Sequence, residues 1–166
     1  DYIKINTTVG DAATPNTLAQ PFAADVDGDG MVNFVYAGDL RGNMWKFDLS
    51  SAAPADWKAA SSRVVLYTAK DSTGNVQPIT APAEGTLHPS GAGYVILFGT
   101  GKFIEAADGL APSFAEQTFY GIWDRNDKPG GISGQTVVAS RASLKEQAIT
   151  EVTVSGTRYR TVPSTG

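Results

Sequence analysis

Short apolar runs separated by turns rich in glycine and aspartate make up most of this chain, a pattern typical of all-β proteins. Residues 44–48 alternate in character, which places Trp45 and Phe47 on one face of a strand and Lys46 on the other. An apolar run precedes this strand across a turn, so the two segments predict a β-hairpin. The strands expected in the first half cover residues 34–37, 44–48 and 63–67, with a turn at 38–43 and a small-residue connector at 51–60.

The second half of the chain repeats this succession of strands and glycine turns. Residues 143–146 match a capping box, so we expect a short helix from Leu144, with a strand as the alternative. The strands expected in this half cover residues 94–98, 102–104, 118–123, 135–139, 150–154 and 157–162, with a turn at 99–101.

One composite pattern occurs twice: an apolar strand, a glycine turn, an aromatic strand and a terminal aspartate, at residues 36–48 and more loosely at 94–108. Such repetition indicates β-propeller blades, which have four strands and about 40–45 residues each. We therefore predict one all-β domain over residues 1–166, a propeller fragment of about three to four blades. That number is at or below the lower limit of a closed ring, so either the rest of the ring was removed or the piece closes against something else. An open sheet edge would favour pairing with another chain.

Residues 25–33 carry the strongest chemical signal in the chain. Three carboxylates at alternate positions would repel one another at neutral pH unless a cation lay among them, and Ca²⁺ is the cation that takes many oxygen ligands. The loop matches the first nine positions of an EF-hand, with Gly30 at the sixth position, where the chain turns sharply. The predicted calcium ligands are the side chains of Asp25, Asp27, Asp29 and Asn33 and the main-chain carbonyl of Met31.

The loop departs from a helix–loop–helix calcium sensor in two respects. Tyr36 stands where an EF-hand has its twelfth-position glutamate, and no helical pattern follows the loop. Further ligands would be water or a side chain from elsewhere, for which Asp39 is a candidate. We expect a dissociation constant on the order of 10⁻⁴ to 10⁻³ M, or tighter if another carboxylate joins. The alternative is a turn that holds no metal, because aspartate and glycine both favour turns.

Composition excludes several classes of function. The 166 residues include no cysteine, which excludes disulfides, thiol catalysis and cysteine zinc sites. The net charge is −4 without a lysine or arginine cluster, which argues against binding to nucleic acid or to an anionic membrane surface. No apolar run approaches the roughly 20 residues of a membrane helix, so membrane insertion is not expected. Because the chain does not begin with methionine, we expect it to be a piece of a longer protein.

The remaining candidates for chemistry are weak. Residues 99–102 lack the serine or threonine that follows the lysine of a phosphate loop. His88 is the only histidine, lies in a loop rich in proline, glycine and serine, and is expected to be solvated. No nucleophile elbow is present. Trp45 and Trp123 are expected to pack between blades rather than to stack on a ligand, so we predict a protein that is not an enzyme.

Three segments in order resemble one known family: DVDGDGMVNFVYAGDLRGNMWKFDLS at 25–50, VILFGTGKFIEAAD at 95–108 and QTFYGIWD at 117–124. This combination is similar to the C-terminal β-propeller of PilY-type pilus-tip adhesins, the relatives of neisserial PilC. The resemblance implies a quinoprotein-like propeller that needs no quinone. It also implies an extracellular place on type IV pili, at the pilus tip or outer membrane of a Gram-negative bacterium.

The resemblance also implies partners and a role. The partners would be pilins or minor pilins and a host or abiotic surface, and the role would be adhesion and calcium-dependent control of pilus extension against retraction. In the family the calcium loop usually has aspartate where this chain has Asn33, so we expect weaker binding here. Two alternatives stay open: a quinone-dependent dehydrogenase of similar blade construction, and a purely structural calcium-repeat module at a surface.

Overall fold

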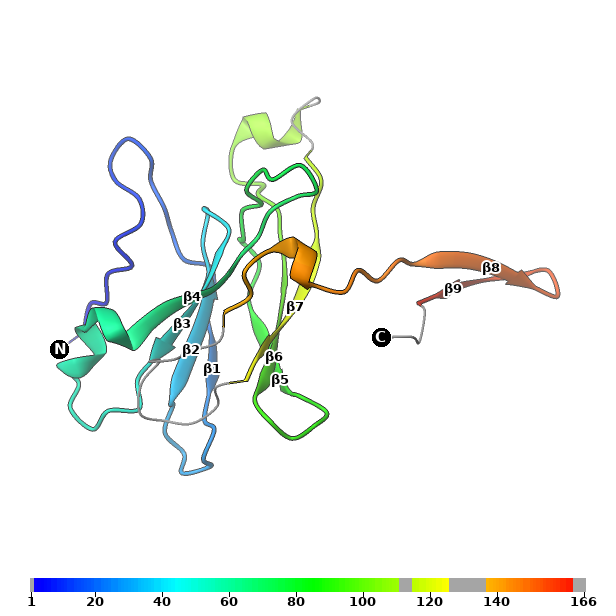
Figure 1. Ribbon diagram of the computed structural model, residues 1–166. Helices are drawn as coiled ribbons and strands as arrows, with labels where there is room; N and C mark the ends of the chain where they lie inside the picture. The colour runs from blue at the N-terminus through cyan, green and yellow to red at the C-terminus, as the bar shows by residue number, and fades with distance from the viewer. Residues whose placement is uncertain (1, 111–114, 126–136, 163–166) are drawn as a thin grey trace.

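The computed structural model describes residues 2–110, 115–125 and 137–162 and shows an all-β chain (Figure 1). The first sheet has four antiparallel strands in the order β1-β2-β3-β4, and the second has three in the order β5-β6-β7. A separate hairpin is formed by β8 and β9. The strands are β1 (Phe22–Ala24), β2 (Phe34–Gly38), β3 (Asn43–Asp48), β4 (Arg63–Thr68), β5 (Glu84–Leu87), β6 (Tyr94–Gly99), β7 (Phe119–Asp124), β8 (Thr150–Val154) and β9 (Thr157–Thr161).

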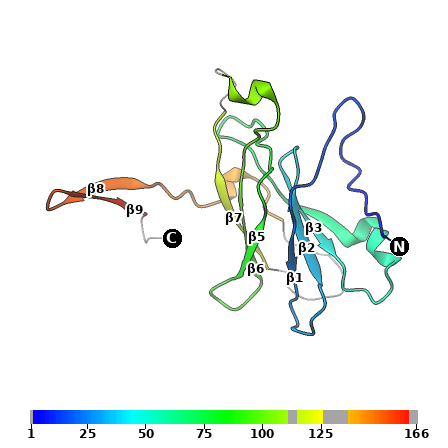
Figure 2. The ribbon, with the colours of Figure 1, turned by 180° about the vertical axis from the view of Figure 1, so that it is seen from behind.

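The two larger sheets lie face to face, and the β8–β9 hairpin projects away from them (Figures 1 and 2). Every residue of the two hairpin strands is exposed. Among the described residues, four short 3₁₀ helices interrupt the connections: η1 (Asp56–Lys58), η2 (Ala60–Ser62), η3 (Ala106–Gly109) and η4 (Arg141–Ser143). Within the described ranges, no helix has the length and apolar character needed to cross a membrane.

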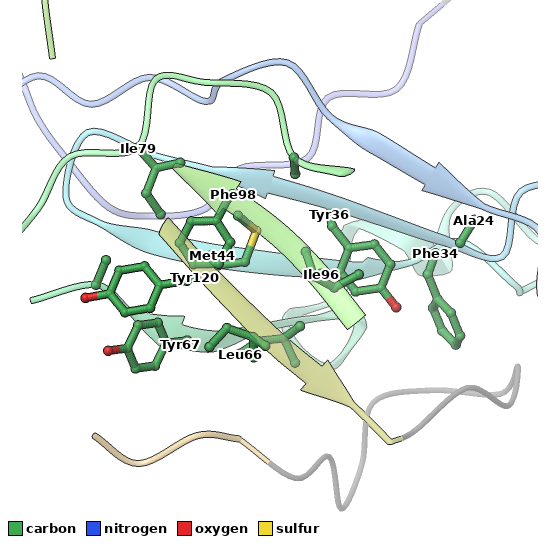
Figure 3. Close-up of a cluster of buried hydrophobic side chains, with 13 residues drawn as sticks. Ala24, Phe34, Tyr36, Met44, Leu66, Tyr67, Ile79, Ile96, Phe98 and Tyr120 are labelled. Atoms are coloured by element: carbon green, nitrogen blue, oxygen red, sulfur yellow. The ribbon is translucent and has the colours of Figure 1, made fainter. Parts of the chain in front are cut away.

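The main hydrophobic core lies between the two sheets (Figure 3). Both sheets contribute large side chains that are almost fully buried, so the sheets are held by a shared core rather than by their loops. The core residues are Ala24, Phe34, Tyr36, Met44, Leu66, Tyr67, Ala69, Ile79, Ala83, Ile96, Phe98, Tyr120 and Ile122. Face-to-face sheets of this kind agree with neighbouring propeller blades, while the expected number of blades stays a prediction.

The opposite face of the first sheet is also covered. Ala37, Trp45 and Phe47 form a second buried cluster, against which Ile5 and Val9 of the N-terminal segment pack. Because both faces are covered, β2 and β3 are buried at nearly every position, and apolar side chains point to both faces of the sheet. Trp45 therefore packs in a buried cluster, but on the face turned away from the second sheet, so its predicted packing between blades stays a prediction.

Lys46 is a position of β3 where the sequence pattern and the burial conflict. Its side chain is fully buried on the core face, and its Nζ atom lies 2.7 Å from Oδ2 of Asp124 in β7. The same oxygen accepts a hydrogen bond of 2.7 Å from the Tyr36 hydroxyl. The Lys46 ammonium also lies 3.8 Å from the centre of the Phe34 ring. An ion pair therefore joins the two sheets inside their common core.

Most of the predicted strands are confirmed within a residue or two. They correspond to β2, β3, β4, β6, β7, β8 and β9. The return strand expected at 102–104 is wrong. Lys102 instead forms ion pairs with Glu105 and Asp108 (3.3 and 3.1 Å), and the Asp108 carboxylate accepts the backbone N–H of Ile104. These contacts close a loop around η3, and β7 takes the place beside β6.

The helix expected from Leu144 is also wrong, because the only helical turn nearby is η4, which ends one residue earlier. Residues 135 and 136 of the expected strand at 135–139 lie outside the described residues, and residues 137–139 are not in a strand. The N–H of Val138 nevertheless donates to the carbonyl of Leu66 in β4 (2.9 Å). Arg141 then donates to Tyr120 and Thr118, both at 3.0 Å, so this segment contacts both sheets.

Two strands were not expected from the sequence. β1 has three residues without alternation, and β5 contains a glycine and only one large apolar side chain. The glycine in β5 is explained by the contact between these two strands, since a Cβ atom on Gly85 would overlap the ring of Phe22 in β1. Glycine therefore permits the close approach of the two sheets at this edge.

Candidate metal centre

The acidic loop joins β1 to β2 at one end of the first sheet, at the bottom of Figure 1. Its two ends are tied together where the N–H of Asn33 donates to the carbonyl of Ala24 (2.9 Å). The loop is thus a hairpin connection anchored in a regular antiparallel pair. Its position relative to the sheet is set by the pairing of β1 with β2.

Backbone amides hold two of the carboxylates in place. Asp25 accepts the N–H groups of Gly28 (2.7 Å) and Gly30 (2.9 Å), one on each oxygen. Asp29 accepts the N–H of Met31 at 2.8 Å. Gly28 and Gly30 have φ values of +76° and +86°, and this left-handed backbone is the reason that glycine suits both positions.

The three carboxylates converge as the sequence predicts. One oxygen from each of Asp25, Asp27 and Asp29 lies within 4.8 Å of the others. Two oxygens that share one calcium at about 2.3–2.6 Å can be up to about 5 Å apart, so this spacing fits a single Ca²⁺ ion. The hydrogen bonds from Gly30 and then Gly28 hold the pKa of Asp25 below its usual value, which keeps that carboxylate charged.

Asn33 lies at the buried base of the loop, with 5% of its surface exposed. Its carboxamide oxygen accepts the N–H of Val26 at 2.7 Å, and its amide nitrogen lies 3.5 Å from Oδ2 of Asp27. In this arrangement the nitrogen, not the oxygen, faces the acidic cluster. Met31, the other predicted ligand beside the three aspartates, lies at the exposed tip of the loop. Coordination by either residue stays a prediction.

Asp39 is not available as a further calcium ligand, so that expectation is wrong. It follows β2 at the end opposite the acidic loop, about 20 Å from Asn33 along a strand of this length. Its carboxylate is fully buried and accepts hydrogen bonds from the Trp45 indole N–H (2.8 Å), the Asn16 amide (2.9 Å) and the Asn43 backbone (2.9 Å). Asp39 therefore organises the β2–β3 turn.

The same turn geometry occurs a second time, which sequence reasoning missed. In both D-x-x-G-N segments, at 39–43 and 71–75, the aspartate accepts the backbone N–H and the side-chain amide of the asparagine four residues later. The side-chain amide of Asn75 is the main cause that lowers the pKa of Asp71 to about 2. The repeated spacing D-x-x-G-N is the sequence signal that could have revealed it.

The expectation that His88 is solvated is wrong as well. Its ring is half-buried and stacks on Trp123, with ring centres 3.8 Å apart and planes 8° from parallel. The guanidinium of Arg125 lies 4.1 Å from the centre of the Trp123 ring. These contacts give His88 a packing role. Trp123 packs on His88 and Arg125 at one end of the second sheet and is not part of the core between the sheets, so the packing between blades expected for it is not seen among the described contacts.

The acidic loop also contacts the second sheet, a feature that no local pattern shows. The hydroxyl of Tyr94, the first residue of β6, lies 3.4 Å from the carbonyl oxygen of Asp25, at the long end of hydrogen-bond range. Phe34, directly after the loop, lies under the Lys46 ammonium that pairs with Asp124. The loop thus sits beside the ion pair that joins the sheets.

Comparison with known proteins agrees with this architecture. A family model described as the PilY1 beta-propeller domain matches residues 2–158. The type IV pilus biogenesis factor PilY1 of Pseudomonas aeruginosa strain PAO1 is 40% identical over 156 residues, which cover 84% of this chain and 13% of that protein. A PilY1 homolog of Xylella fastidiosa is 40% identical over 139 residues, covering 81% of this chain and 9% of that protein.

A solved structure shows the same relationship in three dimensions. The crystal structure of the P. aeruginosa PilY1 C-terminal domain is similar to this chain with a TM-score of 0.69 and 36% identity, covering 92% of this chain and 35% of that one. The chain therefore corresponds to a small part of these longer relatives. On the matches in sequence and structure, it belongs to the PilY1 β-propeller domain family.

Proposed function

We propose that this chain is a non-enzymatic, calcium-binding propeller module of a type IV pilus biogenesis protein. The observation that carries the proposal is the convergence of three carboxylates within 4.8 Å in a loop already shaped by strand pairing and backbone amides. Three negative charges at this spacing suit a hard divalent cation with oxygen ligands. Asp25, Asp27 and Asp29 would hold the ion, and its charge would offset their mutual repulsion.

Calcium bound at this position would act on more than the loop. The loop precedes Phe34, which packs in the shared core under Lys46, and it lies beside Tyr94 of the second sheet. An ion that holds the loop in one shape would therefore also stabilise the end of the interface between the sheets. This is a physical route by which calcium could change the exposed surface of the propeller.

In the cell, we propose that this module acts outside the cytoplasm at the pilus tip or outer membrane of a Gram-negative bacterium. Its partners would be pilins or minor pilins and a host or abiotic surface. Calcium occupancy would favour one conformation of the propeller and so bias pilus extension against retraction, in support of surface adhesion. The names of the relatives, which are type IV pilus biogenesis factors, support the placement on the pilus.

Calcium should raise the thermal stability of the purified chain. At about 10 mM Ca²⁺, ten to a hundred times the expected dissociation constant, binding to the folded state alone adds about 1.4–2.7 kcal/mol. For a chain of this size that corresponds to an increase of about 3–10 °C in the melting temperature. Asp27→Asn, which removes one charge of the cluster, should lose most of this increase.

Asp56→Asn is the matched control, because Asp56 lies in η1 and its carboxylate accepts a hydrogen bond from Ser51 outside the acidic loop. It should keep the full calcium response. Magnesium should give a smaller shift, since Mg²⁺ demands a tight octahedral site and gives up its water reluctantly. No shift with calcium in the wild-type chain, or an equal shift in Asp27→Asn, would refute the calcium site.

A further inference from the structure

The β8–β9 hairpin is a sheet of two strands that stands apart from the rest of the chain. Every residue of both strands is exposed, and the hairpin projects away from the two packed sheets (Figures 1 and 2). Among the described residues, no third strand pairs with either of its edges. A lone two-stranded hairpin is marginally stable at best in water, whereas three or more strands with a hydrophobic face form a stable sheet. A further strand would therefore stabilise this element.

The side chains of the hairpin are sorted by face. Val152 lies opposite Tyr159 in the register, and Val154 lies on the same face. These three side chains are 40–58% exposed, although all are large and apolar. The other face carries charge, since Glu151 lies 3.7 Å from Arg160 there. An exposed apolar face on an incomplete sheet indicates a surface that associates with another strand.

The turn between the strands determines which backbone groups face the open edges. Ser155 and Gly156 both have positive φ values, 52° and 82°, as in the tight two-residue turn of a hairpin. The pair of residues beside such a turn exchanges backbone hydrogen bonds, and so does every second pair along the strands. The N–H and C=O groups of Glu151 and Thr153 belong to the pairs between these, so they point outward from the open edge of β8.

Only one of the two edges is suited to pairing with a copy of itself. In an antiparallel pair centred on Val152, all five residues of β8 are used, and Glu151 lies opposite Thr153 of a second copy. Their outward backbone groups then face each other. The same arrangement centred on the middle of β9 would place Arg158 opposite Arg160 of the second copy, where like charges repel. The charges therefore favour β8.

We propose that two copies of this chain associate through the open edges of β8, in a two-fold antiparallel pair centred on Val152. The two hairpins would form one continuous sheet, with Val152 and Tyr159 of both copies in a single apolar row across it. A contact between two short strands is smaller than a standard stable interface, so the dimer should be weak. The proposal does not depend on the calcium site, and its tests are made in chelator for that reason.

Sedimentation equilibrium of the purified chain, up to about 1 mM protein, should show a monomer–dimer equilibrium. Val152→Lys alone and Val152→Glu alone should each weaken association about tenfold, because two like charges would lie directly opposite each other. An equal mixture of these two variants should form heterodimers, because lysine then faces glutamate. The same two changes at Val154 are the control. The two copies of that residue would lie about 13 Å apart along the strands, so mixing should restore nothing.

Thr153→Pro tests the edge without adding charge. The N–H of Thr153 faces outward, so proline leaves the bonds between β8 and β9 in place but obstructs pairing with a second copy. Arg158→Pro is the matched control, because Arg158 lies opposite Thr153 and its N–H faces outward from β9. Thr153→Pro should abolish the dimer, and Arg158→Pro should keep it.

Three results would overturn the proposal. The first is a wild-type chain that stays monomeric up to about 1 mM, which would mean that the hairpin stays alone or packs on its own chain. The second is a dimer that survives both Val152→Lys and Thr153→Pro, because another surface would then form the contact. The third is the absence of heterodimers from the mixed variants at position 152, or an equal loss of association in the two proline variants. None of these results bears on the proposed calcium site, which is tested separately by the thermal response to calcium.

Discussion

Replacing Lys46 with methionine will lower the free energy of unfolding by about 3–5 kcal/mol, because it breaks a buried ion pair by removing only one of its two members. The two side chains are 0% and 1% exposed, and their charged atoms are 2.7 Å apart. Methionine has nearly the length of lysine without the charge, so the loss of packing should be small beside the electrostatic cost. Denaturation by urea, followed by circular dichroism, measures the change.

The double variant Lys46→Met, Asp124→Asn separates the loss of the buried ion pair from a general packing defect. It removes both charges, and the new carboxamide oxygen can still accept the hydrogen bond that Tyr36 makes to Asp124. At least about half of the lost stability should return, because removing both members of a buried pair often costs little. A double variant that is less stable than Lys46→Met would show that the charge on Asp124 is not the cause.

A surface ion pair provides the comparison for position 46. Arg160 lies 3.7 Å from Glu151 in the β8–β9 hairpin, where both side chains are more than half exposed. Arg160→Met should change stability by less than about 1 kcal/mol, since exposed pairs contribute little. Equal losses for Lys46→Met and Arg160→Met would contradict the role given to burial.

The second large effect is expected at Gly93, which is buried directly before β6. Its φ is +74°, and a Cβ atom there would overlap the backbone carbonyl oxygen of Asp124. Gly93→Ala should therefore destabilise the chain by about 3 kcal/mol or more, because a backbone atom cannot move aside as a flexible side chain can. The melting temperature and urea midpoint of the purified variant test this.

Gly91 separates the effect of the clash from the effect of the backbone angle. Its φ is +76°, almost the same as that of Gly93, but a Cβ atom there would meet nothing within 4 Å. Gly91→Ala should lower the free energy of unfolding by only about 1–2 kcal/mol, which is the cost of placing alanine in the left-handed conformation. If the two variants lose the same stability, the close approach of Gly93 to Asp124 does not constrain the fold.

Both effects concern the same end of the interface between the sheets. Gly93 allows the chain to pass close to Asp124, and Asp124 then pairs with Lys46 beside the Phe34 ring. The acidic loop precedes Phe34 and contacts Tyr94, which follows Gly93. A loss of packing at this end should therefore also weaken the proposed calcium binding, since the loop is supported there by both sheets.

The strands and the acidic loop could be found in the amino-acid sequence because their signals are local. Alternation over a few residues marks β3, and three aspartates at spacing two converge wherever the chain turns at glycines. The strand expected at 102–104 is wrong because its local pattern does not show which strand pairs with β6. Lys102 forms an ion pair with Asp108 within its own loop, and β7 pairs with β6.

The roles of the buried polar residues depend on neighbours that are distant in the chain. The alternating pattern places Lys46 on the polar face of β3. In the structure that face packs against the second sheet, where the Asp124 carboxylate forms an ion pair with Lys46. Asp39 looked like a spare ligand, yet the packing of β3 brings the Trp45 indole to it. The amino-acid sequence shows which polar side chains a segment carries. The packing of the two sheets decides which of these side chains contact one another. A charged or hydrogen-bonding side chain is stable in the core only when its partner is buried beside it.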